Sequence, residues 1–257
     1  MSNILVCVKR VPDTGGEVSL TEDSMGVDAR HLGFTVSPHE ECAIELAVQT
    51  AAATDGEVTV LTVGEDDAVE QLRDAVALGC TGAVLVEVDP SAYGPADIAQ
   101  AIAEVVRAHE SAGTAYDLIL LGNDAADTGD FQVGVRLAYA LGRPVLTGIS
   151  TLEVGDGQVQ ARGDGPTGGT EVYEVDLPAV VTIMEGGVEP RYPTIPGRMK
   201  AKRAKIETLE PELTPLGSAR RRLTLPPRPP NQVTVLGEGP AAAPAVADLL
   251  QELGVLR

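Results

Sequence analysis

Short apolar runs alternate with helical patterns along the first 141 residues of the chain. Runs bounded by turn residues predict buried strands at residues 3–8, 57–63, 83–88 and 117–121. Apolar residues at helical spacing predict helices that follow these strands, at residues 38–53, 66–78, 95–110 and 131–141. Because parallel neighbouring strands need a crossover connection, this alternation predicts an α/β fold with a doubly wound, mostly parallel sheet.

The pattern changes after about residue 150. Alternating runs at 149–154, 158–161 and 170–175 predict antiparallel hairpins, the first two around a Gly-Asp-Gly turn. The run at 177–184 predicts a buried strand that rejoins the main sheet. Residues 186–230 hold too many prolines for compact secondary structure throughout, so we expect a C-terminal extended arm there, followed by a short helix at 244–253.

Composition narrows the class of protein. The chain is 44% hydrophobic but only 3% aromatic, with no Trp, which is typical of a parallel sheet core built from Val, Leu, Ile and Ala. Three cysteines, at 7, 42 and 80, show no metal-ligand spacing and fit a reducing cytoplasm. No apolar run approaches the roughly 18 residues of a membrane span, so we expect neither a signal peptide nor membrane insertion.

Charge is unevenly distributed along the chain. The formal net charge is −19, which excludes an ordinary basic nucleic-acid binder. Residues 1–187 hold 8 basic and 31 acidic side chains, a net of 8 − 31 = −23, whereas residues 188–228 hold 10 basic and 4 acidic, a net of +6. A basic segment therefore follows a strongly acidic domain.

A doubly wound sheet binds ligands at the carboxyl ends of its strands, and one loop there stands out. The loop GNDAADTGDFQVG, residues 122–134, has three Gly, three Asp and one Asn before a predicted helix. Its backbone amides and the helix N-terminus can hold a phosphate, with a ribose nearby. The loop can equally be a solvated turn whose Asp residues cap the helix.

Other motifs give no catalytic set. The GxGxxG match at Gly163, Gly165 and Gly168 contains Pro166 and precedes a strand pattern, so a hairpin loop is favoured over a dinucleotide site. No phosphate-binding P-loop occurs, and no carboxylate pair or Ser/His/Asp order supports a hydrolase. Any chemistry is therefore expected to be carried by a cofactor.

The segment EPRYPTIPGRMKAKRAKIE, residues 189–207, combines a proline-stiffened loop with a run of cations. It can be a solvated charged linker. It can also be a docking element, in which the exposed Ile195 is an anchor and the flanking cations guide a protein partner.

Five stretches together resemble the β subunits of electron transfer flavoproteins, over nearly the whole chain. They are VCVKRVPD, SPHEECAIELA, GNDAADTGDFQVG, LPAVVT and, most specifically, the segment 189–207. The resemblance implies an adenine-nucleotide α-hydrolase-like fold and a heterodimer with an α subunit that carries the redox FAD. It also implies electron transport in fatty acid oxidation, from acyl-CoA and related flavin dehydrogenases to a quinone oxidoreductase, with no enzyme activity of its own.

The resemblance also implies roles for particular residues. The residues that correspond to the family's AMP site are Cys7, Lys9, Ser37, Pro38, His39, Glu40, Val63, Gly122, Asn123, Asp127, Thr128, Gly129, Asp130, Gln132, Val133 and Gly134. Thr14 and His39 fall near the FAD. Docking of partners falls on Arg191, Tyr192, Ile195, Pro196, Met199, Lys200, Lys202 and Lys205. Family members have an acidic residue where this chain has Gly165.

These observations predict three parts of the chain. They are a nucleotide-binding domain at 1–187, a basic recognition loop and arm at 188–230, and a tail helix at 231–257 that packs on the α subunit. Two alternatives stay open: a bifurcating electron transfer flavoprotein with a second FAD in the AMP site, and a nucleotide-binding sensor related to universal stress proteins. A nucleotide-binding sensor would not explain the basic, proline-rich arm.

Overall fold

The chain forms two compact units in the computed structural model, one of residues Met1–Leu223 and one of Thr224–Arg257. The structure describes residues 1–13, 15, 18–28, 30, 32–216, 220–227 and 233–256. The first unit holds the whole sheet, and the second holds a 3-10 turn followed by α6 (Ala243–Glu252). The predicted boundary after residue 187 does not coincide with a division between units, because residues 188–223 belong to the unit that contains the sheet.

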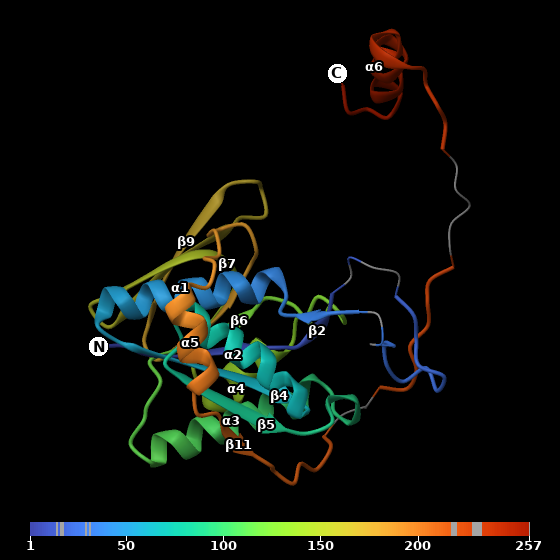
Figure 1. The fold of residues 1–257 in the computed structure, drawn as a ribbon. Helices are drawn as coiled ribbons and strands as arrows, with labels where there is room; N and C mark the ends of the chain where they lie inside the picture. The colour runs from blue at the N-terminus through green and yellow to red at the C-terminus, as the bar shows by residue number, and fades with distance from the viewer. Residues whose placement is uncertain are drawn as a thin grey trace. The chain divides into compact units, whose positions relative to one another are not determined.

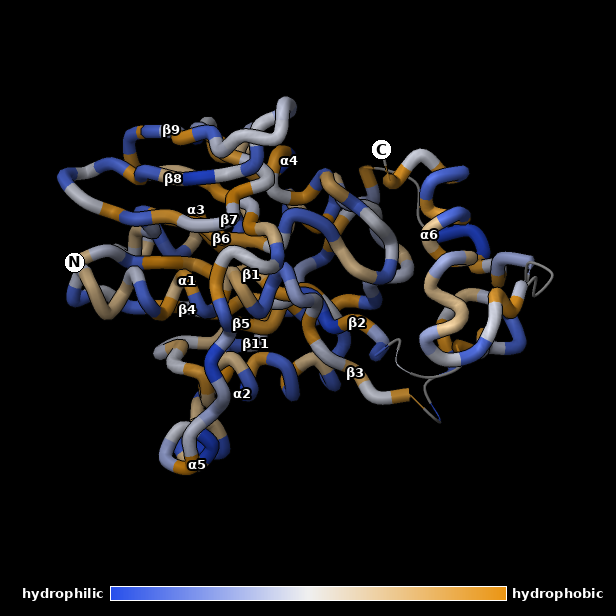
Figure 2. The backbone as a smooth tube through the Cα atoms, turned by 90° about the horizontal axis from the view of Figure 1, so that it is seen from above, coloured by the Kyte–Doolittle hydropathy of each residue, from blue (hydrophilic) through white to orange (hydrophobic). Residues whose placement is uncertain are grey.

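A nine-stranded sheet organises the first unit, in the spatial order β11-β5-β4-β1-β6-β10-β7-β8-β9 (Figure 1). Its central parallel strands are β1 (Asn3–Val8), β4 (Glu57–Gly64), β5 (Gly82–Glu87), β6 (Leu118–Gly122) and β10 (Ala179–Ile183). The predicted doubly wound, mostly parallel sheet is confirmed. Figure 2 shows β1 and β6 coloured mainly as hydrophobic, as expected for strands that are covered on both faces.

Two helices cover each face of the parallel sheet. Side chains of α1 (Pro38–Thr54) and α2 (Val69–Leu78) build the core on one face. Side chains of α3 (Pro95–Ser111) and α4 (Val133–Leu141) build the core on the other face. The predicted helix 66–78 begins as a 3-10 turn, Asp66–Ala68, and α4 begins two residues later than predicted.

The hairpins expected after residue 150 extend the same sheet. β7 (Val145–Gly155), β8 (Gln158–Asp164) and β9 (Thr170–Asp176) pair antiparallel, and β7 joins β10 in parallel. The glycine-rich match lies in the β8–β9 turn, where the Gly165 amide donates to the Gly169 carbonyl at 2.6 Å. The hairpin interpretation of that motif is therefore confirmed.

The proline-rich segment is not extended over its whole length, and this part of the prediction is wrong. It contains α5 (Ile195–Arg203) and β11 (Glu207–Leu209), which pairs with β5. Thr194 caps α5 by accepting from the Gly197 amide, and Pro196 occupies the first turn, where a missing N–H costs nothing. Among the described residues between 210 and 227, no helix or strand occurs, as an extended arm requires.

A short ladder near the carboxyl edge was not predicted. β2 (Val11–Pro12) pairs antiparallel with β3 (Phe34–Thr35), immediately after β1 and before α1. Two residues per strand are too few to produce a readable alternation, so the sequence pattern gives no signal for them.

Candidate functional site

The strand order reverses next to β1, at the centre of the parallel sheet. From β1 the chain builds outward through β4 and β5, then crosses to the other side of β1 to form β6. Cys7 of β1 pairs with Leu121 of β6, so these two strands end together. In doubly wound sheets such a reversal is where ligands bind. The predicted AMP residues follow β1, β4 and β6 and begin α1 and α4, so the topology gathers them at this edge.

The first turn of α1 is closed by its own side chains. Ser37 caps the helix, and the Glu40 carboxylate accepts from the Ser37 amide at 2.9 Å and from its hydroxyl at 3.1 Å. The other Glu40 oxygen accepts from the Lys9 amide at 2.7 Å, just beyond β1. These contacts form a capping box. Burial of Glu40 raises the pKa of its carboxyl to about 7.

Close approach of β6 to α1 depends on Gly122. A Cβ at this position would lie 2.8 Å from Cγ of Glu40 and 3.2 Å from Cβ of His39. Only glycine lets the end of the strand touch the helix start this closely. Cys7 of β1 is buried in the core on the face covered by α3 and α4, and this burial raises the pKa of its thiol, which keeps the thiol protonated and unreactive.

The loop after β6 folds back on Lys9. The Lys9 ammonium lies 2.6 Å from a carboxylate oxygen of Asp127 and donates to the Thr128 hydroxyl at 3.4 Å. A turn closes when the amides of Thr128 and Gly129 donate to the Ala125 carbonyl. Gly129 has a φ of +65°, which favours glycine. One cation therefore holds the loop to the end of β1.

The N-terminus of α4 is open. Gln132 precedes the helix without capping it, because its side-chain oxygen accepts from the guanidinium of Arg136. Within the described residues, nothing accepts from the amides of Gln132, Val133 and Gly134. Gly134 packs so tightly on β10 that a Cβ would lie 2.3 Å from Cγ2 of Thr182. Open amides and the helix dipole make this end suitable for an anion.

Two polar side chains near the crevice have their orientation set by backbone donors. The Asn123 oxygen accepts from the Gly148 amide at 2.9 Å and from the Thr182 hydroxyl at 2.7 Å, which leaves the amide nitrogen of Asn123 on the other side. His39 Nδ1 accepts from the Glu185 amide at 3.0 Å. The neutral ring therefore carries its proton on Nε2, 2.7 Å from a carboxylate oxygen of Asp124.

Three further predicted site residues lie apart from these contacts. Val63 is half-buried on β4, one strand away from β6 across β1. Asp130 is half-buried between the Ala125–Gly129 turn and α4. Its carboxylate accepts no hydrogen bond from a described residue. Thr14 lies outside the described residues. Asp124, Thr182 and Glu185 were not predicted, because each contributes through a contact that is distant in sequence.

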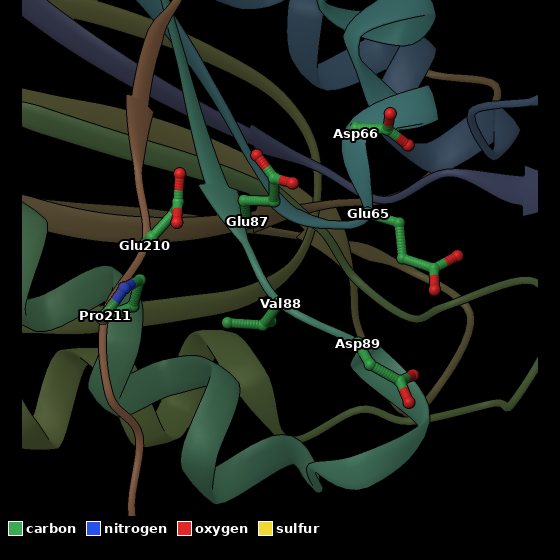
Figure 3. Close-up of a pocket in the computed structure, with 7 residues that line it drawn as sticks. All are labelled: Glu65, Asp66, Glu87, Val88, Asp89, Glu210 and Pro211. Atoms are coloured by element: carbon green, nitrogen blue, oxygen red, sulfur yellow. The ribbon is translucent and has the colours of Figure 1, made fainter.

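A hollow of about 500 Å³ lies beside the ends of β4 and β5 (Figure 3). Its lining consists of Glu65, Asp66, Glu87, Val88, Asp89, Glu210 and Pro211. Carboxylates repel phosphate, and no cation is among these residues, so this hollow is unsuited to a nucleotide phosphate. Within the described chain, no group of acidic, His or Cys side chains is arranged to hold a metal ion.

The predicted docking residues lie on and before α5. Tyr192 is 90% exposed, Ile195 81% and Met199 51%, an apolar stripe that no described residue covers. Lys200, Lys202 and Lys205 are exposed and form no ion pair with a described residue, and Pro196 is exposed in the first turn. Arg191 differs, because its guanidinium binds Glu45 of α1 through Nε at 2.6 Å and Nη2 at 2.8 Å.

Comparisons with known proteins show which family the chain belongs to. A family model described as the electron transfer flavoprotein domain matches residues 25–214. The electron transfer flavoprotein subunit beta of Bacillus subtilis is 36% identical over 210 residues, 81% of this chain and 79% of the relative. The chain belongs to the family of electron transfer flavoprotein β subunits.

Relatives of this family come from distant organisms. The electron transfer flavoprotein subunit beta of Syntrophomonas wolfei is 36% identical over 206 residues, 80% of this chain and 78% of the relative. The mitochondrial subunit beta of Oryza sativa is 35% identical over 215 residues, 81% of this chain and 82% of the relative. The resemblance inferred from the five sequence stretches is confirmed. The named relatives are all β subunits of electron transfer flavoproteins.

None of the described helices combines the length and the apolar character that crossing a membrane requires.

Proposed function

We propose that this β subunit holds one AMP at the carboxyl ends of β1 and β6, and docks flavin dehydrogenases so that FAD on an α subunit accepts their electrons. The open N-terminus of α4 is the observation that carries the nucleotide proposal. Its free amides would hold the phosphate, and Lys9, which contacts Asp127 and Thr128 of the loop before α4, would add a positive charge.

The closed N-terminus of α1 would form the other wall of the AMP site. Both carboxylate oxygens of Glu40 accept hydrogen bonds from Ser37 or Lys9, and a carboxylate repels phosphate, so Glu40 would shape the site rather than contact the phosphate. The amide nitrogen of Asn123 would remain for a ribose or base oxygen. A loop with three Asp residues could hold an anion in this way, because the phosphate would contact backbone amides rather than carboxylates.

Electron transfer would be carried by the flavin and not by this chain's side chains. The chain has 2 Phe, 5 Tyr and no Trp, so it offers few flat surfaces to enclose a flavin. The exposed stripe of Tyr192, Ile195 and Met199, flanked by lysines, would dock acyl-CoA and related flavin dehydrogenases. A quinone oxidoreductase would receive the electrons, and the C-terminal tail with α6 would pack on the α subunit.

The test uses the co-purified heterodimer of this chain and its α subunit. After denaturation, mass spectrometry of the released small molecules is expected to find one FAD and one AMP per heterodimer. The intact heterodimer is expected to oxidise an acyl-CoA dehydrogenase that has been reduced by its own acyl-CoA. Two FAD and no AMP would identify a bifurcating carrier instead. Release of no adenine nucleotide beyond FAD, without electron uptake, would overturn the proposal.

A further inference from the structure

An ion pair joins the start of the docking segment to the core of the subunit. We define the docking segment as residues 189–205. Arg191 lies at its beginning and donates to Glu45 of α1 three times: from its amide at 3.2 Å, from Nε at 2.6 Å and from Nη2 at 2.8 Å. Gln49 donates to the same carboxylate at 2.7 Å. Glu45 is 5% exposed, whereas the Arg191 side chain is 42% exposed.

Such a contact is stronger than an ordinary surface ion pair. A bidentate Arg–carboxylate bond sets both the distance and the plane of the guanidinium. The guanidinium and the amide of Arg191 hold the pKa of the Glu45 carboxyl below its usual range, and the carboxylate raises the pKa of Arg191. Both groups are therefore charged at neutral pH, and the Arg191 side chain is not free to guide a partner.

The rest of the docking segment is held by α2. A Cβ on Gly197 would lie 2.3 Å from the Ala77 carbonyl oxygen, so α5 touches the end of α2 through backbone. Arg73 of α2 donates to the Ala201 carbonyl at 2.6 Å, near the end of α5. Only Tyr192 and Pro193 separate Arg191 from the Thr194 cap. The position of Ile195 at the start of α5 is therefore set from both sides.

We infer that Glu45 is a positioning residue for partner docking: through Arg191 it holds the Ile195 anchor in the orientation that a dehydrogenase recognises. The inference rests on the proposed docking function. It reassigns Arg191 from a guiding surface cation to the internal partner of Glu45. Without the ion pair, the segment before α5 samples more orientations, and a partner must select among them, which raises KM without slowing the electron step.

The test replaces Glu45 by Gln in the full heterodimer, with an acyl-CoA dehydrogenase reduced by its acyl-CoA as the probe. KM for the reduced dehydrogenase is expected to rise about tenfold, while kcat and FAD content stay within about twofold. Arg191→Lys, which keeps the charge but loses the fork, is expected to raise KM by an intermediate factor. An unchanged KM in Glu45→Gln would overturn the inference, as would a fall in kcat alone.

A matched control exists on α3. Glu104 accepts from Gln100 at 3.0 Å, one helical turn away, as Glu45 does from Gln49, but it forms no ion pair with a described residue. Glu104→Gln is expected to leave KM unchanged. If Glu45→Gln does not assemble, Arg191→Lys decides: an assembled Arg191→Lys with the original KM would overturn the inference.

Ile195→Ala separates this inference from the function on which it rests. If Ile195→Ala raises KM and Glu45→Gln does not, docking stands and the positioning role of Glu45 fails. If neither change raises KM, the docking function of this segment fails as well. A rise in both, with Glu104→Gln unchanged, supports the inference.

Discussion

The two helix starts at the carboxyl edge of the sheet solve the same problem in opposite ways. Each has backbone amides without intrahelical partners. At α1 the Ser37 side chain accepts from the Glu40 amide, and the Glu40 side chain accepts from the Ser37 amide. The Glu40 carboxylate also accepts from the amide of Lys9. At α4 the side chain of Gln132 binds Arg136 instead of capping the helix, and no acceptor for the first amides is found in the part of the chain that the structure describes. A helix start at this edge is therefore suited to an anion only where the chain's own side chains leave its amides open.

Gly134 lies in the first turn of α4, and Gly134→Ala is the change expected to disturb this helix start most. The new methyl group would lie 2.3 Å from Cγ2 of Thr182, a stiff β-branched residue that also donates to Asn123. We expect a loss of about 1–3 kcal/mol in the free energy of unfolding and loss of the bound nucleotide. Urea unfolding and mass spectrometry of the released nucleotide measure the two effects.

A second substitution provides the control for this experiment. Thr182→Ser removes Cγ2 and keeps the hydroxyl that donates to Asn123, so Gly134→Ala/Thr182→Ser is expected to recover most of the stability and the nucleotide. Full nucleotide content in Gly134→Ala alone would show that the start of α4 does not hold the phosphate.

The contribution of Glu40, at the closed end of α1, to the free energy of unfolding is expected to depend on pH. The Glu40 pKa of about 7 in the folded protein lies above its ordinary value of 4.5, so the folded state binds this proton more tightly than the unfolded state. Wild type should therefore lose stability relative to Glu40→Gln as pH rises from about 4.5 to about 7, by roughly 3 kcal/mol, with little further change above pH 8. Urea unfolding of both proteins between pH 5 and pH 8 measures the difference. A difference that does not vary with pH would contradict the raised pKa.

Lys9 is expected to give the smallest change in stability. Its ammonium is partly exposed, so losing the contact with Asp127 in Lys9→Met should cost less than about 1 kcal/mol. The loop before α4 would then be tethered less firmly, and nucleotide content should fall although the fold is kept. Arg30→Met, which removes a surface pair with Asp28 remote from α4 in sequence, is the comparison variant. Equal nucleotide content in the two variants would exclude a role for Lys9 in the site.

Local patterns were sufficient for much of the fold. The apolar runs of β1, β4, β5 and β6 were located within one or two residues, because a strand that is buried on both faces must be apolar along its length. The Ser37–Glu40 capping box is also a local feature of the sequence, since both partners lie within one helical turn. In contrast, α5 was hidden by Pro196 and by the prolines that precede it, because proline breaks a helix interior but is tolerated in the first turn.

The sequence by itself determined the class of fold, the family and the edge of the sheet where a ligand would bind, because these depend on periodicity and on residues close together along the chain. Only the tertiary structure decided which helix start is open and which is closed by Glu40, and that Arg191 pairs with Glu45. Its partner Glu45 lies 146 residues earlier, within an otherwise apolar helical pattern that carries no sign of a contact at that separation. Such pairings follow from packing across the whole unit, which no local pattern contains.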